Sequence, residues 1–560
     1  MMLDAPYAEV ARALEREACE GDTITRVDIR RHPPSARTAA DRALGATSEA
    51  AGLEPATTDV FVVRAYLRLH EGGLCSEVER RESERLLRAQ KFIASAAVTV
   101  RQVSPGYVTI RVDVVDEWPY VVGGGVSSGH LSSLRLGTLN LMGRGLSVVG
   151  SVERGGVYRN GAGIRLEQYG LAGRPAYAEL TAERRPLGGT LHLEAAQPFL
   201  TYQQRGALRG SVTEQTEFVR LARPSGDDAA VQSSRSAYDI AWVGRAGSPR
   251  RDGLVGLVGL ALMREEVISD SGSVIVSDSG LVQTLDSALI GRYPSFSAER
   301  VGLILGVRAL NFVTVDRFST LRAAQDVGRG IRASLVIAPS LSAARGKADV
   351  LLSGDVYAGM GSRASFVTLR AGAEARGLAR QVPWRGVAAS ARVNWNRVAL
   401  GRRSGLTSLT AGALGRALVP SQLTFRDLDD GLLGSAGSHD AGGRRVVLRQ
   451  EERLLVDWFR NRADVALAIF ADVGKLWRGD VPYGATTPVR GSVGISLLGS
   501  YPNGKRTFRL DLALPLNPGS ENARFAVRLS SADRTGTSWM EAGDIARVRA
   551  SSGPATLTRW

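Results

Sequence analysis

Long hydrophobic runs are missing from this sequence. The longest strongly apolar stretch, residues 253–263, spans 11 residues, whereas a membrane-spanning helix needs about 20. The chain is therefore not a helical membrane protein. A transmembrane β-barrel is not excluded, because each of its strands needs only about 9–11 residues.

Residues suited to metal binding and covalent chemistry are scarce as well. The 560 residues include 5 histidines and 2 cysteines. The histidines are scattered, with no pair four positions apart, and so predict no metal site. The glycine run at 123–125 lacks the Lys-Ser/Thr pair of a phosphate loop. We expect no cofactor, no metal and no enzymatic activity.

Lysine is nearly absent, and aromatic residues are few. Of 71 basic residues, 4 are lysine and 67 are arginine, and the net charge is +15. The arginines are spread along the chain with no block of like charge, which does not mark a nucleic-acid-binding face. We expect no nucleic-acid partner. Aromatic residues make up 6%, so any aromatic girdle at a membrane surface is thin.

Glycine is the residue in excess, with 64 against an ordinary 21 prolines. Such an excess favours tight turns and bent strands over disorder. The chain divides near Trp118: patterns of both helix and strand precede it, and the 442 residues after it contain almost no convincing helix. Residues 1–19 are interpreted as a leader or linker, although no secretory signal is visible there.

Residues 20–118 have the pattern of a small α+β domain in the order strand, helix, helix, strand, strand. Apolar residues at helical spacing predict a helix within 57–70. Ser76 and Glu79 have the spacing of a capping box, which predicts the start of a second helix. Two strands follow, at 97–103 and 107–115. In the last, valine and isoleucine alternate with polar residues, so one face packs on the helices.

Residues 119–560 show repeated two-residue alternation separated by turn clusters. The clearest case is Phe508, Leu510, Leu512 and Leu514, which alternate with Arg509, Asp511 and Ala513. Many of these runs approach ten residues, longer than the five or six typical of a soluble sandwich. An outward apolar face and a polar lumen are typical of a transmembrane barrel.

Residues 20–118 resemble a POTRA domain, the periplasmic module of the BamA/TamA outer-membrane assembly family. The element order matches, and so do the phrases RAYLRLHEGG, RESERLLRAQKF and VDVVDEW. In the second part, LRLGTLNLMGRGLSVV resembles the first barrel hairpin of that family, FRLDLALPL a penultimate strand and ARFAVRLSS a closing strand.

The resemblance implies an N-terminal α+β POTRA domain in the periplasm, followed by an all-β antiparallel barrel of about 16 strands in the bacterial outer membrane. It implies insertion of outer-membrane proteins or export of a polypeptide, without bond chemistry. The implied partners are outer-membrane lipid, unfolded polypeptide clients and a periplasmic protein. That protein would add a strand to the edge strand at 97–103. The alternative is that the domain only spaces and caps the mouth of the barrel.

The resemblance also implies a set of site residues on the inner wall. The segment 444–477 resembles the family block that contains a Glu-x-Arg strand and a Phe-x-Asp-x-Gly strand. Those positions are Glu451, Arg453, Phe470, Asp472 and Gly474.

The family's inward loop carries an Arg-Gly-aromatic tip, which falls here on Leu433-Gly434-Ser435. Gly434 matches, but the arginine and the aromatic residue are replaced. In the family the arginine pairs with the aspartate at the position of Asp472. We therefore expect Asp472 to lack that partner, with Arg426 as the candidate substitute.

Three further features allow more than one interpretation. Cys19 and Cys75 form a disulfide if the chain is exported, and are unpaired thiols otherwise. Residues 532–560, which end in Trp560, are an additional strand or a tail that folds elsewhere. The alternative functions are a passive outer-membrane pore for small solutes, favoured by the missing loop arginine, and a soluble β-rich binding protein, favoured by the sparse aromatics.

Overall fold

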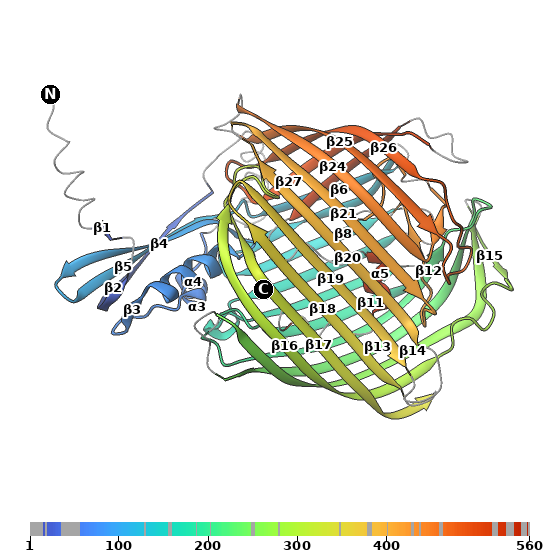
Figure 1. Ribbon diagram of the computed structural model, residues 1–560, viewed down its shortest axis with the longest axis horizontal. Helices are drawn as coiled ribbons and strands as arrows, with labels where there is room; N and C mark the ends of the chain where they lie inside the picture. Colours follow the sequence, from blue (N-terminus) through green and yellow to red (C-terminus); the bar gives the residue numbers. More distant parts are fainter. Residues whose placement is uncertain are drawn as a thin grey trace.

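The computed structural model describes two parts of the chain, a small α+β domain and a large barrel (Figure 1). The described residues are 15–16, 19–34, 57–533, 543–549 and 557. Short gaps within them fall at 128–129, 155–159, 186, 202, 248–252, 278–279, 346–348, 378–383, 400, 427–429, 436–437, 458–462 and 518–524. Among these residues, no helix is long and apolar enough to cross a membrane.

The N-terminal domain is a five-stranded sheet with two helices against it, in the sheet order β1-β4-β5-β2-β3. Its elements are β1 (Glu15–Arg16), β2 (Glu20–His32), α3 (Val60–Tyr66), β3 (Leu74–Ser76), α4 (Glu77–Arg88), β4 (Ile93–Ser104) and β5 (Tyr107–Asp116). The strand at 97–103, expected at the sheet edge, lies within β4. There β1 pairs with Arg101 and Val100, so the segment before residue 20 adds a short strand beyond it.

The alternation in β5 builds the core of this domain. Its even-numbered apolar residues Val108, Ile110, Val112 and Val114 are fully buried together with Leu86 and Leu87 of α4. Burying one such side chain contributes about 1.5–3 kcal/mol. The sheet face and the helices therefore hold each other, as the two-residue pattern predicts.

The capping box predicted at Ser76 is wrong. Ser76 is the N-cap of α4, but its side chain makes no capping hydrogen bond among the described residues. The residue is also the end of β3, where it pairs with Glu20. This strand pairing holds the backbone extended, and the acidic residues Glu77 and Glu79 in the first turn supply the favourable charge.

The barrel begins two residues after Trp118 and closes through pairing of its last strand with its first. Its strands are β6 (Tyr120–Ser127), β7 (His130–Leu141), β8 (Leu146–Glu153), β9 (Gly161–Tyr169), β10 (Tyr177–Arg185), β11 (Gly188–Gln197), β12 (Gly206–Leu221), β13 (Asp228–Ala246), β14 (Val255–Ser277), β15 (Gly280–Thr284), β16 (Phe296–Val315), β17 (Gln325–Arg345), β18 (Val350–Gly361), β19 (Ser365–Gly377), β20 (Arg385–Val398), β21 (Arg403–Gly415), β24 (Arg444–Val456), β25 (Asp464–Trp477), β26 (Arg490–Ser500), β27 (Arg506–Pro515) and β28 (Ala526–Asp533).

The expected count of about 16 strands is too low. In the described chain the ring has 20 strands, because β15 pairs only with β14 and β16 also pairs directly with β14. The extra strands fit because connections at one rim are short: β18 and β19 are separated by 362–364, and β26 and β27 by 501–505. These turns therefore use few residues.

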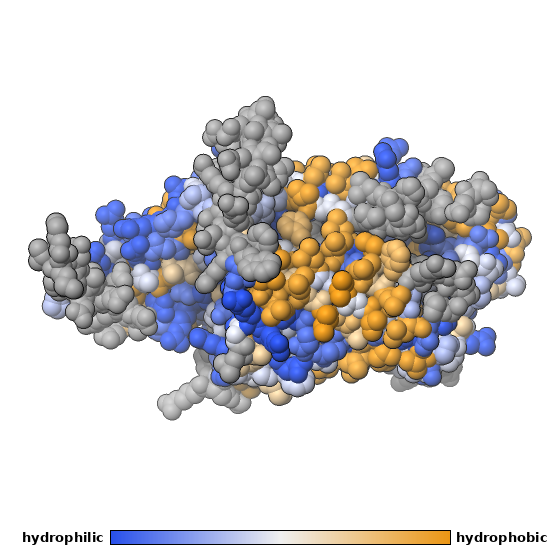
Figure 2. Space-filling view, turned by 90° about the horizontal axis from the view of Figure 1, so that it is seen from above, coloured by the Kyte–Doolittle hydropathy of each residue, from blue (hydrophilic) through white to orange (hydrophobic). Residues whose placement is uncertain are grey.

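The two faces of the wall differ as the alternation predicts. On β27, Leu510, Leu512 and Leu514 are exposed on the outside, whereas Arg509 and Asp511 are buried inside. Figure 2 shows a broad apolar band over the barrel and a mostly hydrophilic N-terminal domain. A soluble sandwich is therefore the wrong interpretation, because these leucines form an outer surface and not a core.

The N-terminal domain packs on the rim with the short turns. The Arg85 guanidinium donates to the carbonyl of Leu200 at 2.9 Å, and Arg88 forms an ion pair with Asp326 at 2.9 Å. At the start of β6, Trp118 stacks on Tyr501 with 4.6 Å between ring centroids. The domain is thus attached to turns that are far apart in the sequence.

Candidate functional site in the barrel lumen

The long connection between β21 and β24 folds into the barrel. It contains the short pair β22 (Leu423–Thr424) and β23 (Ala441–Gly442). Its residues Leu423, Phe425, Leu432 and Leu433 are buried against the inner wall. We call residues 416–443 the inward loop.

Asp472 on β25 receives the tip of the inward loop. The backbone N–H of Leu433 donates to the Asp472 carboxylate at 2.9 Å. The Ser492 hydroxyl on β26 donates to the same carboxylate, and Arg449 on β24 forms an ion pair with it at 3.3 Å. Asp472 thus lacks an arginine from the loop tip, as expected, but it has an arginine partner all the same. The partner comes from the neighbouring strand, where Arg449 lies opposite Asp472 in register.

Arg426 does not substitute for the missing loop arginine. Its guanidinium pairs with Asp228 at the start of β13, at 3.2 Å. Arg220 on β12 pairs with the same carboxylate. Arg426 therefore ties the inward loop to another part of the wall, away from Asp472.

Two glycines let the inward loop approach the wall closely. The N–H of Gly434 donates to the Ser492 hydroxyl at 3.2 Å, and a Cβ on Gly434 would lie 2.7 Å from the Ser492 Cβ. A Cβ on Gly474 would lie 2.9 Å from the ring of Phe425. Phe425 is fully buried. The glycines thus provide the space in which the loop tip and this aromatic ring pack.

Phe470 lies two residues before Asp472, on the same inward-facing side of β25. It forms the apolar surface on which the loop tip packs. It is buried with Leu433 and Ala513. A Cβ on Gly494 would lie 2.4 Å from the Phe470 ring. The side chain thus fills a gap that only a glycine on β26 leaves open.

Glu451 and Arg453 belong to a buried charge network further along the wall. Arg453 pairs with Glu451 on the same strand, and Arg509 on β27 pairs with Glu451 at 2.7 Å. Arg509 also pairs with Asp511 and donates to the Ser496 hydroxyl at 2.9 Å. No local pattern in the sequence indicated Arg509 as the partner of Glu451, because this contact joins residues 58 positions apart.

The C-terminal segment also lies in the lumen, which sequence reasoning left open. The short helix α5 (Gly543–Val548) packs beside the inward loop, and Ile545 is buried with Leu423 and Phe425. In Figure 1, α5 lies inside the ring of strands. Residues 543–549 are therefore part of a tail that folds elsewhere than in the wall. Of residues 555–560, the candidate additional strand, only Leu557 is among the described residues.

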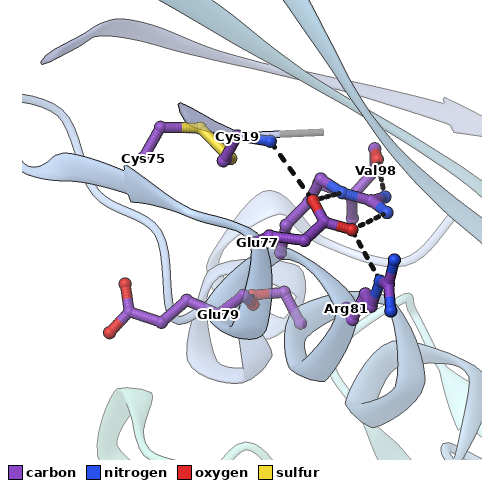
Figure 3. The surroundings of a disulfide bond; sticks show 8 residues. Cys19, Cys75, Glu77, Glu79, Arg81 and Val98 are labelled. Carbon is purple, nitrogen blue, oxygen red and sulfur yellow. Dashed lines mark hydrogen bonds and ion pairs between the residues drawn. A yellow bond between two sulfur atoms is a disulfide. The ribbon is translucent and has the colours of Figure 1, made fainter. Parts of the chain in front are cut away.

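Cys19 and Cys75 are joined in a disulfide, with 5.1 Å between their Cα atoms (Figure 3). Beside it, Glu77 accepts hydrogen bonds from Arg80, from Arg81 and from the N–H of Cys19. Burial disfavours the charged form of Glu77, but these hydrogen bonds outweigh it and lower its pKa to about 2. The bond ties the start of β2 to β3 next to α4.

Asp116 joins the N-terminal domain to the barrel. It accepts hydrogen bonds from the N–H and the hydroxyl of Thr58, at 2.6 and 2.7 Å. The Asn140 amide on β7 donates to the same hydroxyl at 2.8 Å. Burial raises the pKa of Asp116 to about 6, although the Thr58 hydrogen bonds and the charge of Arg31 act in the opposite direction.

The chemistry of the lumen is that of ion pairs and hydrogen bonds. Among the described residues, no group of three or more His, Cys, Asp or Glu side chains gathers as a metal site would require. Carboxylates and guanidinium groups that neutralise each other in a partly dry space can hold a folded loop or a polar polypeptide.

No protein-family model and no curated protein matches the sequence. The solved structures that are similar include the following three, all at low identity. CdiB from Escherichia coli is 10% identical, with a TM-score of 0.49, over 91% of this chain and 76% of that chain. CdiB from Acinetobacter baumannii is 10% identical, with a TM-score of 0.41, over 91% and 74%. BamA from Haemophilus ducreyi lacking POTRA domains 1–3 is 11% identical, with a TM-score of 0.35, over 91% and 84%. At such identities, function has to be inferred from the residues of this chain.

Proposed function

We propose that this chain is a bacterial outer-membrane barrel that inserts outer-membrane proteins or moves polypeptides across the membrane. The observation that carries the proposal is the inward loop with its tip at Asp472. Its Leu433 N–H donates to that carboxylate, and Gly434 donates to Ser492 next to it. The resemblance noted in the sequence implies a loop at this place. The backbone contact supports that position for the tip without the family's arginine.

The N-terminal domain is proposed to be a POTRA domain in the periplasm. Its order β2, α3, α4, β4, β5, to which the short strands β1 before β2 and β3 between the helices are added, and its attachment to the rim with short turns support this. The Cys19–Cys75 disulfide fits an oxidising compartment. The sheet edge at β1 and β4 is then the place where an extended partner chain would add a strand.

Client strands would pair at the seam between β28 and β6. These strands have 8 residues each, whereas β14 has 23 and β17 has 21. At the rim of the N-terminal domain, Arg506 on β27 donates to the carbonyl of Tyr120 at 2.6 Å, and Trp118 stacks on Tyr501. The start of β6 is thus fastened to the β26–β27 hairpin across β28. In this arrangement β28 can separate while β6 stays in place.

The test is assisted folding of a reporter barrel. The full chain is reconstituted in phospholipid vesicles, and a small unfolded outer-membrane barrel is added. Folding is followed by the gel mobility shift between unboiled and boiled samples. We expect severalfold faster folding than with empty vesicles, and a return to the empty-vesicle rate with Asp472→Asn. Equal rates for vesicles with and without the protein would contradict the proposal.

A passive pore for small solutes is the second candidate, favoured by the charged inner wall around Glu451 and Arg509. Conductance in planar bilayers separates the two functions. A large, steady, ungated current from the unmodified chain, together with no acceleration of reporter folding, would establish the pore.

A further inference from the structure

Residues 543–549 are held in the lumen by two buried ion pairs of opposite polarity. Asp544 pairs with Arg445 on β24 at 2.7 Å. Arg549 pairs with Asp355 on β18 at 3.4 Å, and it donates to the Ser353 hydroxyl at 2.9 Å. Its guanidinium also lies 3.8 Å from Glu374 on β19. The wall can therefore bind a carboxylate at one point. At a second point it can bind the guanidinium of a residue five positions later in the segment.

Between these charges, the segment fills an apolar hollow. Ile545 is fully buried and Val548 nearly so, against Leu414, Leu423 and other residues of the wall and the inward loop. A Cβ on Gly412 would lie 2.8 Å from the Ile545 side chain. The hollow accepts an aliphatic residue directly after the acidic one.

The wall also binds the backbone of the segment. The Arg235 guanidinium on β13 donates to the carbonyls of Arg547 and Arg549, at 3.4 and 3.0 Å. Carbonyl contacts of this kind do not depend on side-chain identity. Arg547 itself pairs with Glu217 on β12 at 3.4 Å. The contacts run from β12 to β24, which lie about half-way round the ring from each other, so the segment crosses the lumen.

A second contact of the C-terminal region lies near the opposite rim. Leu557 is buried with Phe199 and Ala207, and its carbonyl accepts a hydrogen bond from the Phe199 N–H at 3.2 Å. Phe199 precedes β12 beside the turn that contacts α4. The C-terminal region is therefore attached at two levels of the lumen.

We infer that the lumen carries a binding site for a short polypeptide with an acidic residue, an aliphatic residue after it and an arginine five positions after the acid, and that the chain's own residues 543–549 occupy this site and close the passage. The inference rests on the proposed function, in which a client segment of similar chemistry would take the place of the tail.

The first experiment releases the segment by removing both charges. Asp544→Asn with Arg549→Gln is reconstituted in planar bilayers as the full chain, after its heat-modifiable gel mobility shows a folded barrel. We expect the open probability to rise at least tenfold over the unmodified protein. The matched control is Asp28→Asn with Arg30→Gln, which removes an exposed pair in the N-terminal domain and leaves the current unchanged.

The second experiment supplies the segment from outside. The chain is ended after residue 541, and the peptide AGDIARVRA, residues 542–550, is added to the open channel. We expect a saturable block. AGNIARVQA, which lacks both charges, should block with an affinity at least tenfold lower. Equal block by the two peptides, or no block, would overturn the binding site.

A covalent lock covers the case in which the release variants do not fold. Gly412→Cys with Ile545→Cys places two thiols at the buried contact. The oxidised protein should stay closed, and reduction should restore the open events of the unmodified protein. Reductant added to the unmodified protein controls for the native disulfide. Open events in the oxidised lock equal to those of the unmodified protein would overturn closure by this segment.

These readouts do not depend on what the barrel transports. If the peptide and lock results hold and reporter folding is not accelerated, the barrel is a gated channel and the insertion proposal fails. If reporter folding is accelerated but release, peptide and lock have no effect, the insertion proposal stands and the tail is a structural filler.

Discussion

Two carboxylates in the N-terminal domain have pKa values shifted in opposite directions. The pKa of Asp116 is raised to about 6 by burial, and the hydrogen bonds of Glu77 lower its pKa to about 2. A carboxyl with a raised pKa in the folded state favours folding when it is protonated. One with a lowered pKa favours folding when it is ionised. The two residues therefore predict that the free energy of unfolding is greatest between the pH range in which Asp116 ionises and the range in which Glu77 becomes protonated.

For Asp116, stability should rise as the pH falls from about 6 to about 4. The gain should be complete once the pH is below the pKa that this carboxyl has in the unfolded chain. Asp116→Asn should remove this rise, because the amide cannot ionise. The measurement is the urea midpoint of the full chain in detergent, followed by the helical circular dichroism signal at pH 7, 6 and 5. The same rise in the variant would show that another group titrates.

The contribution of Glu77 to stability should be fully present above about pH 4.5 and be lost as the pH falls toward 2. Glu77→Gln should flatten this acid limb and lower stability at neutral pH, because it loses the ionic hydrogen bonds from Arg80 and Arg81. The urea midpoint at pH 5, 4 and 3 measures it. Glu79, in the same helical turn, provides the control Glu79→Gln, for which the acid limb should remain.

Gly434 tests how tightly the loop tip fits. In Gly434→Ala, the new Cβ meets Ser492 at 2.7 Å, and overpacking of this kind costs about 1–3 kcal/mol. We expect the inward loop to become more susceptible to trypsin, measured as the cleavage rate of the folded chain in detergent. Gly499→Ala on β26 is the matched control, because a Cβ there meets nothing within 4 Å. Equal cleavage rates for both variants would argue against a docked tip.

At the scale of the elements, the disulfide closes a loop of 56 residues that contains α3. A chain-entropy estimate gives about 4 kcal/mol for a loop of this length. Cys19→Ser with Cys75→Ser should therefore unfold the N-terminal domain at lower urea concentration and leave the heat-modifiable mobility of the barrel unchanged. If the folded domain and the heat-modifiable mobility were lost together, the barrel would depend on the domain. The rim contacts of Arg85 and Arg88 provide a physical route for such a dependence.

The elements also show which features could be predicted from the sequence. Alternation in β5 and β27 is a local property of the chain, and it correctly predicted the buried and the outward faces. The strand count depends on how little chain the turns use, which apolar periodicity does not report. The capping box failed because Ser76 is held by a strand pairing with Glu20, a contact made across 56 residues.

In the candidate site too, contacts between residues far apart in the sequence could not be predicted from local patterns. Gly434 and Asp472 could be placed near each other by resemblance, because the phrase order carries that information. The arginine partner could not, since Arg449 is selected by strand register and Arg426 by the direction in which the loop leaves the wall. Asp544 and Arg549 have no local pattern at all. Their partners lie on β24, β18 and β19, so only the closed barrel brings them together.

At the scale of the whole molecule, both the barrel and the N-terminal domain have exposed apolar residues on their strands. Leu510 on β27 is 42% exposed within the outer band, and Val103 on β4 is 63% exposed on the N-terminal domain. Leu510 lies near the middle of its strand, opposite Leu497 and Leu529 on the neighbouring strands. If the band faces hydrocarbon, arginine is disfavoured at Leu510 and accepted at Val103.

Leu510→Arg should therefore lower the free energy of unfolding in phospholipid vesicles by about 2–4 kcal/mol, the range for arginine at the bilayer midplane of a barrel. Val103→Arg should change it by no more than about 0.5 kcal/mol, as expected for a surface substitution. Urea titration read by the gel mobility of unboiled samples measures both variants. Equal small effects would place the leucines of β27 in water, and the barrel would then need another explanation for its apolar outer face. A large effect at Leu510 alone assigns that face to lipid, because the two substitutions add the same charge to exposed strand positions and differ only in what surrounds them.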